Sequence, residues 1–282
     1  MDSEHKNGCP HMAAGGSATS VRDAGARPLL RRISEVERDS EPGSPMRRIA
    51  SWVHEFLALP HPDVGRRGSV CPFVPLSLEM DAIWMAEVSQ PDPKFDEIAR
   101  IITALREEFI AMEPVSGSEA MQKSILVVLP TLVQNATLVD EVQLALKKHF
   151  VDVGLMLGEF HSNNESPGLR NPDFRPLRSP VPMLAIRYMV ESDLPFLMRD
   201  STPPAERSAF LRSYLARMGR GLTPNKFELV LNRLIAAEIE VWAAAATAAT
   251  AAGHAHAAMQ PAPGQSLREP KRSSALSVGA SQ

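Results

Sequence analysis

Two short segments of this 282-residue chain carry side chains suited to chemistry: VCPF (70–73) and GEFH (158–161). The first contains the thiol of Cys71, inside an apolar segment and directly before a proline. A nearby positive charge would be needed to favour the thiolate and make Cys71 a nucleophile. Cysteine is also among the most frequently buried residue types, so inert packing is the alternative role.

His161 ends the second segment, where the apolar run VGLMLGEF (153–160) gives way to a polar loop. Ligands commonly bind beyond the carboxyl ends of strands in α/β sheets. A neutral imidazole there can ligate a metal ion or haem iron, or act as a base. Glu159 and Glu165 flank His161 and could orient its ring or bind an amine. A half-exposed loop histidine between solvated carboxylates is the alternative.

Arginines cluster near both segments. Arg66 and Arg67 precede the Cys-Pro turn and could form a fork for a carboxylate, although a plain surface turn fits as well. Three more arginines follow His161 in a loop rich in Asn and Pro: Arg170, Arg175 and Arg178. Their guanidinium groups could pair with haem propionates or with a substrate carboxylate, or simply remain solvated.

Four apolar runs predict the strands that would position these residues. They cover residues 81–88, 124–129, 153–160 and 183–188. Helical patterns occupy residues from 45 to about 59, 94–112, 138–150, 193–198, 204–218 and 224–242. This order predicts a mixed α/β (α+β) fold, with one mixed sheet of about four strands covered by helices and a helical C-terminal part.

The composition changes at both ends of this pattern. Residues 1–45 are rich in Gly, Ser and charged groups and nearly lack large apolar side chains, which predicts a disordered tail. Residues 46–242 are expected to form a single globular α/β domain. Residues 243–282 are alanine-rich and then polar, so they are expected to form a second disordered tail.

The charge and cysteine content narrow the classes of function. A net charge of −3 argues against a broad surface for nucleic acid or anionic membrane. Two cysteines, with no apolar leader segment at the N-terminus, indicate a reducing, cytoplasmic location. No run reaches the roughly 18 apolar residues that would span a bilayer. The expected partner is a small-molecule substrate, with a homodimer left open as an option.

The common sequence signatures assign no reaction. A Walker A loop, a Rossmann glycine fingerprint and a nucleophile-elbow serine are all absent from the sequence. No two histidines have the spacing of a zinc site, so a structural zinc is not expected. His161 is the candidate metal ligand because of its place at the strand end.

Three sequence blocks in order resemble an uncharacterised bacterial domain family that is often encoded near natural-product genes. The blocks are GRRGSVCPF (65–73), GLMLGEFH (154–161) and NPDFRPLRSPVPMLAIRYMVESDLPFL (171–197). The resemblance covers about Arg48 to Met218. Because that family has no assigned function, the resemblance implies a domain and a setting in secondary metabolism.

The layout of the chain also resembles, more distantly, the YqcI/YcgG-like haem-dependent N-hydroxylases. The shared features are a Cys-Pro turn before the first strand, the strand end at Phe160-His161-Ser162, an arginine loop and a proline-bracketed strand (181–188). Three features depart from that pattern. The order is Cys-Pro instead of Pro-Cys, Ser162 replaces an expected proline, and the C-terminal helices extend further.

This second resemblance implies a haem-dependent oxygenase acting on a small amine or guanidine metabolite. His161 would be the axial ligand to iron, Arg170, Arg175 and Arg178 would pair with propionates or substrate carboxylate, and Cys71 would line the pocket. Two alternatives remain open. One is a non-catalytic module that binds a small molecule or a partner, and the other is a thiol enzyme that uses Cys71 with His161 as its base.

Overall fold

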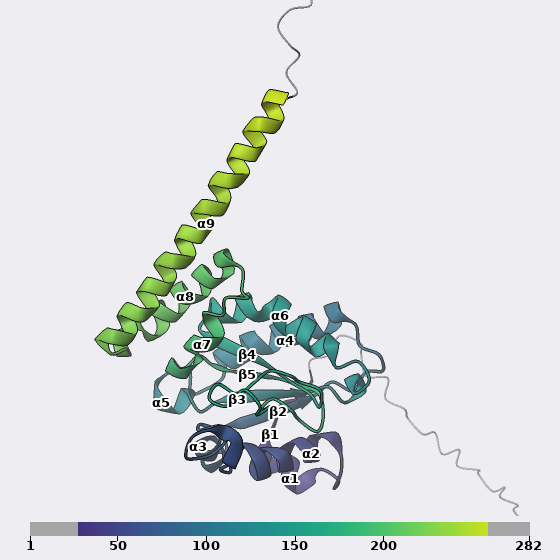
Figure 1. The fold of residues 1–282 in the computed structure, drawn as a ribbon. Helices are drawn as coiled ribbons and strands as arrows, with labels where there is room; N and C mark the ends of the chain where they lie inside the picture. Colours follow the sequence, from purple (N-terminus) through teal and green to yellow (C-terminus); the bar gives the residue numbers. More distant parts are fainter. Residues whose placement is uncertain (1–27, 259–282) are drawn as a thin grey trace, which may run out of the picture. The chain divides into compact units, whose positions relative to one another are not determined.

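The computed structural model describes residues 28–258, with side chains described up to residue 250 (Figure 1). The chain divides into two compact units, of which the first ends at Val190 and the second begins at Glu191. This boundary falls inside the range 46–242 that the sequence predicts as one domain.

The first unit is built on one open mixed sheet with the strand order β1-β2-β3-β5-β4. The strands are β1 (Arg31–Arg32), β2 (Ile83–Glu87), β3 (Ser124–Val128), β4 (Leu155–Phe160) and β5 (Met183–Tyr188). The four apolar runs of the sequence form the four longer strands, so the predicted mixed α+β class is confirmed. The two-residue strand β1 adds an antiparallel edge beside β2.

Three of the strands end at the same edge of the sheet. β2 and β3 are parallel, whereas β5 runs antiparallel to both β3 and β4. β2, β3 and β4 therefore point the same way, and the register places Phe160 beside Met183, which in turn pairs with Val128. The loop after β4 begins at this common edge, as the sequence predicts for His161.

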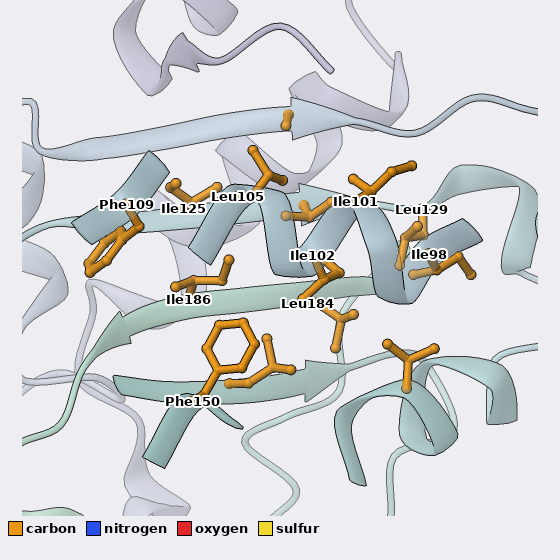
Figure 2. Close-up of a cluster of buried hydrophobic side chains, with 14 of the residues drawn as sticks. Ile98, Ile101, Ile102, Leu105, Phe109, Ile125, Leu129, Phe150, Leu184 and Ile186 are labelled. Atoms are coloured by element: carbon orange, nitrogen blue, oxygen red, sulfur yellow. The ribbon is translucent and has the colours of Figure 1, made fainter. Parts of the chain in front are cut away.

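Two long helices cover one face of the sheet, α4 (Phe95–Ala111) and α6 (Thr137–Val151). The apolar side chains of α4 recur at helical spacing and pack onto alternate residues of the strands (Figure 2). Phe109 and Leu105 of α4 and Ile125 and Ile186 of the sheet are completely buried. This face, called the closed face below, holds the larger hydrophobic cluster.

Shorter helices cover the opposite face (Figure 1): α1 (Ile33–Asp39), α2 (Pro45–Trp52), the π-helical turn η1 (Val53–Leu57) and α3 (Val74–Glu79). Ser44 caps α2 by accepting a hydrogen bond from the backbone N–H of Arg47, and Pro45 occupies the first helical position. Ile49 belongs to a second buried cluster, which also contains Met85 and Met183. This side is called the open face below.

Part of the predicted N-terminal tail is ordered, which corrects the expectation of disorder up to residue 45. Arg31 and Arg32 pair with β2, and α1 places Ile33 and Val36 in the core of the open face. The segment contains few apolar residues, but these two lie three positions apart and therefore share one side of a helix. Residues 1–27 of the predicted tail lie outside the described residues.

Short helices complete the first unit between the main elements. They are η2 (Pro62–Val64), α5 (Gly117–Ala120) and η3 (Pro130–Leu132).

The second unit is helical. Its elements are η4 (Glu191–Asp193), α7 (Leu194–Leu197), α8 (Pro204–Met218), η5 (Gly219–Gly221) and α9 (Pro224–Ala258). α8 and α9 pack against each other, and Tyr214 of α8 is fully buried and donates a hydrogen bond to the backbone oxygen of Glu191. Burial, reinforced by the carboxylates of Glu191 and Asp193, raises the pKa of Tyr214 to about 12.

Helix α9 continues to Ala258, well into the range 243–282 that the sequence predicts as a tail. Residues 259–282 lie outside the described residues. None of the helices in the described part of the chain combines the length and the apolar content that a membrane span requires.

Candidate functional site

A cavity of about 510 Å³ opens on the open face, close to the carboxyl end of β4. It is called the groove below. Eight residues line it: Trp52, Phe56, Asp63, Asn171, Asp173, Phe174, Arg175 and Arg178. They come from the α2–η1 helix, from the loop after it and from the loop after β4. The groove therefore joins segments more than 100 residues apart in the sequence.

Aromatic rings form one wall of the groove. Trp52 stacks on Phe56 with ring centroids 5.6 Å apart, and the ring of Phe160, the last residue of β4, meets Trp52 edge-on at 5.9 Å. Phe56 also contacts Phe174, which stacks on His61 at 4.9 Å. The π-helical turn at Val53–Leu57 carries Phe56, and such turns are frequent at functional sites.

Arg175 and Arg178 form the cationic side of the groove. Arg175 Nε lies 3.2 Å from Glu165 Oε2, and Arg178 Nη2 donates to the other carboxylate oxygen of Glu165. Both guanidinium groups, Arg178 most strongly, lower the pKa of Glu165, so this residue stays a carboxylate. Arg178 Nε also donates to the backbone oxygen of Asn164 at 3.2 Å. The two arginines are therefore held in place by groups of the protein itself.

Asp63 and Asp173 form the anionic side of the groove, one from each loop. Asn171 connects these loops, because its Nδ2 donates to the backbone oxygen of Asp63 at 2.9 Å and its Oδ1 accepts from the backbone N–H of Asp173 at 3.0 Å. Carboxylates and guanidinium groups thus surround one cavity with an aromatic wall.

A second cavity of about 510 Å³ adjoins the groove and shares Trp52 and Phe56 with it. Its other lining residues are Gly43, Arg47, Ser51, Glu55, Arg48 and Pro180. Arg48 Nη2 donates to the backbone oxygen of Pro180 at 3.0 Å, which ties α2 to the segment before β5. Trp52 and Phe56 therefore line both cavities.

His161 is buried on the other side of the sheet. Successive strand residues point to opposite faces, so Phe160 reaches the open face and the next side chain turns towards α6. The His161 side chain is 5% exposed, and its Nε2 lies 3.0 Å from Asp140 Oδ1 on α6. Its Nδ1 is buried and makes no hydrogen bond within the described residues. The backbone of His161 anchors the long loop through hydrogen bonds with Leu177 and Ser179.

Cys71 packs at the edge of the open-face cluster, and its backbone N–H donates to Leu57 at 2.9 Å. Cys71 and His161 thus lie on different faces of the sheet, and the structure does not bring them together. Glu159 is half-buried, and its backbone oxygen accepts a hydrogen bond from Asn164.

Arg66 and Arg67, the predicted fork for a carboxylate in the turn at Gly65–Gly68, do not line the groove. Arg66 donates to the backbone oxygens of Arg67 and Val70, while Arg67 is exposed. The turn nevertheless meets the arginine loop, because a Cβ added to Gly65 would lie 2.9 Å from the Cβ of Arg170. Arg170 itself is exposed at this junction.

The residues that the distant resemblance implies for haem do not surround one cavity. His161 turns towards α6 on the closed face, whereas Arg175 and Arg178 line the groove on the open face. Among the described residues there is also no group of three or more His, Cys, Asp or Glu side chains that could hold a metal ion. Haem binding stays a prediction from the sequence.

Most groove residues were not among those predicted from the sequence. Trp52 and Phe56 have the helical spacing of core residues, so the sequence does not show that they line a cavity. Asn171, Asp173 and Phe174 gave one usable signal, since NPDF (171–174) opens the third sequence block, whereas Asp63 had none. Asp140, the partner of His161, had no distinguishing signal on its predicted helix.

A family model described as "Domain of unknown function (DUF6875)" matches residues 46–227. This range includes every lining residue of the groove and ends in the first turn of α9. The match confirms the predicted resemblance to a domain family without an assigned function. No curated protein and no solved structure matches the chain.

Proposed function

The chain belongs to the family Domain of unknown function (DUF6875), and we propose that its first unit binds a small zwitterionic metabolite in the groove. The ligand would carry an amine or guanidine cation and a carboxylate. The observation that carries this proposal is the groove lining, where acidic and guanidinium side chains surround an aromatic wall. A volume of about 510 Å³ lies within the usual range for small-molecule sites.

The aromatic wall and the two aspartates suit the cationic end of such a ligand. An ammonium or guanidinium group is attracted to the face of an indole or phenyl ring, and Trp is the strongest partner. Asp63 and Asp173 offer carboxylate oxygens as acceptors at the same cavity. Partial exclusion of water by Trp52, Phe56 and Phe174 strengthens both interactions.

Arg175 and Arg178 suit the carboxylate end. A planar guanidinium group presents paired N–H donors that match the two oxygens of a carboxylate. Glu165 already forms ion pairs with both arginines and therefore uses some of their N–H donors. An incoming carboxylate would therefore share the arginines with Glu165 or replace it, and specificity would depend on that competition.

Binding is the function that the geometry supports best. The lining residues contain no thiol, hydroxyl or imidazole group that could act as a nucleophile or as a base of intermediate strength. Oxidation of a bound amine at haem is the chemistry that the distant resemblance implies, and no step of it follows from the groove.

The test is calorimetric titration of the full chain with L-arginine, which carries a guanidinium group and a carboxylate. Agmatine, the same molecule without the carboxylate, is the comparison ligand. We expect saturable binding of L-arginine to the unmodified chain. Agmatine should bind this chain about tenfold or more weakly, and the Arg178→Gln variant should bind L-arginine about tenfold or more weakly, because each change removes a charge-assisted hydrogen bond. Trp52→Ala should weaken binding of both molecules, since both carry the cation.

The matched control is Arg67→Gln, which removes an exposed arginine outside the groove and should leave affinity unchanged. The proposal is wrong if neither molecule binds saturably, or if Trp52→Ala and Arg178→Gln bind L-arginine as tightly as the unmodified chain does.

A further inference from the structure

Helix α9 carries a row of exposed, large apolar side chains, called the stripe below. Its members are Phe227, Leu231, Ile235, Ile239 and Trp242, each between 38% and 78% exposed. They recur every three or four residues, so they lie on one side of the helix. Single exposed apolar residues are ordinary on a protein surface, but a continuous row of this length marks an interaction site.

The stripe is separate from the side of α9 that packs on α8. Val230 and Ala237 of α9 are completely buried, and α9 packs against α8. Ion pairs flank that contact, with Arg207 Nη2 2.6 Å from Glu240 Oε2 and Arg212 bonded to Glu238. The α8 side of α9 is therefore already occupied, and the stripe is a second apolar surface.

We propose that the stripe pairs with the same stripe of a second copy of this chain, with the two α9 helices antiparallel and the two-fold axis at Ile235. In this register Ile235 meets its own equivalent, Leu231 meets Ile239, and Phe227 lies level with Trp242. The apolar pattern is thus complementary to itself when reversed, as an isologous two-fold interface requires.

The area of the stripe is sufficient for such a pair. With about 200 Å² for a fully exposed large side chain, the measured exposures leave about 500 Å² of apolar surface per copy. Two copies would bury about 1,000 Å², which is near the lower limit for a specific interface. Trp242 is the most exposed member, and tryptophan is the residue type that most often dominates binding energy at interfaces.

Other occupants fit the stripe less well. The N-terminal segment 1–27 has Met1, Met12 and Val21 as its large apolar residues, and segment 259–282 likewise lacks aromatic residues. A helix that lies on an anionic membrane usually has a basic polar face. In contrast, residues 224–250 of α9 contain three glutamates against one lysine and one arginine.

The stripe lies almost entirely beyond the family domain, which ends at residue 227. Dimerisation through α9 would therefore be a property of this chain's C-terminal extension. It is independent of the groove, whose lining residues all lie in the first unit.

The first test is sedimentation equilibrium of the full chain over a range of concentrations. We expect a dimer of twice the 30.8 kDa chain mass. Ile235→Glu places two like charges on the two-fold axis and should weaken self-association roughly 100-fold. Leu229→Glu is the matched control, because Leu229 is equally apolar and 43% exposed on α9 but lies off the stripe.

The second test needs no disruptive variant. In a Cys9→Ser, Cys71→Ser background, Ile235→Cys should form a disulfide-linked dimer under mild oxidation, whereas Leu229→Cys should not. The proposal is overturned by a monomer at every concentration, by a dimer that Ile235→Glu leaves intact, or by equal cross-linking at positions 229 and 235.

Discussion

The two faces of the sheet are covered by helices of different length, and this difference separates the sealed core from the groove. The closed face carries α4 and α6, of 17 and 15 residues, whereas the open face carries α1, α2 and α3, of 7, 8 and 6 residues. Long helices span the strands and seal their side chains completely. Short helices leave the strand ends beside β4 partly uncovered, and the groove forms there.

The side chains on the two faces differ accordingly. The closed face is mainly aliphatic, with Phe109 and Phe150 fully buried among Ile, Leu and Val. On the open face, Trp52, Phe56 and Phe160 are only partly buried and border a polar loop. Aromatic side chains that keep one surface free can contact a ligand while they still contribute to packing. The comparison therefore predicts opposite consequences for substitutions on the two faces.

The largest expected effect is a contrast between Phe109→Ala and Trp52→Ala. Phe109 is completely buried, so its truncation leaves a cavity and should lower the free energy of unfolding by about 3–5 kcal/mol. Trp52 is partly exposed, so its truncation should cost about 1–2 kcal/mol while it weakens ligand binding in the groove. Urea unfolding measures both changes. If Phe109→Ala and Trp52→Ala lowered the free energy of unfolding equally, the two faces would not differ in their contribution to stability.

Lys123 offers the next test, because it is a charged residue enclosed by the closed face. It is 1% exposed, and its Nζ donates to the backbone oxygens of Phe109 at 3.1 Å and Met112 at 2.5 Å. The ammonium group thus satisfies carbonyls at the end of α4 and lies 4.8 Å from the ring centroid of Phe109. Lys123→Met should lower the free energy of unfolding by about 1–3 kcal/mol, since these carbonyls lose their donor.

The pH dependence of the free energy of unfolding, compared between the unmodified chain and Lys123→Met, separates the effect of the buried charge from that of the hydrogen bonds. Burial lowers the pKa of Lys123 below its usual 10.5, with Glu113 opposing this effect. The folded state therefore releases the proton before the unfolded state does, and this residue's contribution to stability rises between the lowered pKa and 10.5. The advantage of the unmodified chain over Lys123→Met should grow with pH in that interval. A constant difference would show that the buried charge carries no penalty.

Much of the sheet could be predicted because its strands are continuous apolar runs. The predicted strand 183–188 coincides with β5 (Met183–Tyr188), and the predicted strand 124–129 extends one residue beyond β3 (Ser124–Val128). β1 and α1 were missed because only Ile33 and Val36 mark them, and these two side chains find a core only once the strands are assembled.

The candidate site was less predictable for two physical reasons. Phe160 and His161 are neighbours in sequence, yet strand alternation sends them to opposite faces, and the pattern does not say which residue faces the groove. The groove also depends on contacts between the α2–η1 helix and the loop at 171–178. No local pattern reports such contacts, so Trp52 and Phe56 resembled ordinary core residues.

The smallest expected effect concerns the junction of the two loops that shape the groove. Gly65 has a φ of +74°, and a Cβ there would lie 2.9 Å from the Cβ of Arg170. Gly43 has a similar φ of +84°, but an added Cβ would meet nothing within 4 Å. Gly43→Ala therefore measures the backbone penalty alone, which should be about 1 kcal/mol.

Gly65→Ala should cost about 1 kcal/mol more than this control, because the loop that carries Arg170 must also shift. The shift should weaken ligand binding in the groove as well, whereas Gly43→Ala should leave affinity unchanged. Urea unfolding and the L-arginine titration together give both quantities. Equal effects of the two substitutions would mean that the loop contact does not shape the groove, and the open face would then owe its binding geometry to the aromatic wall alone.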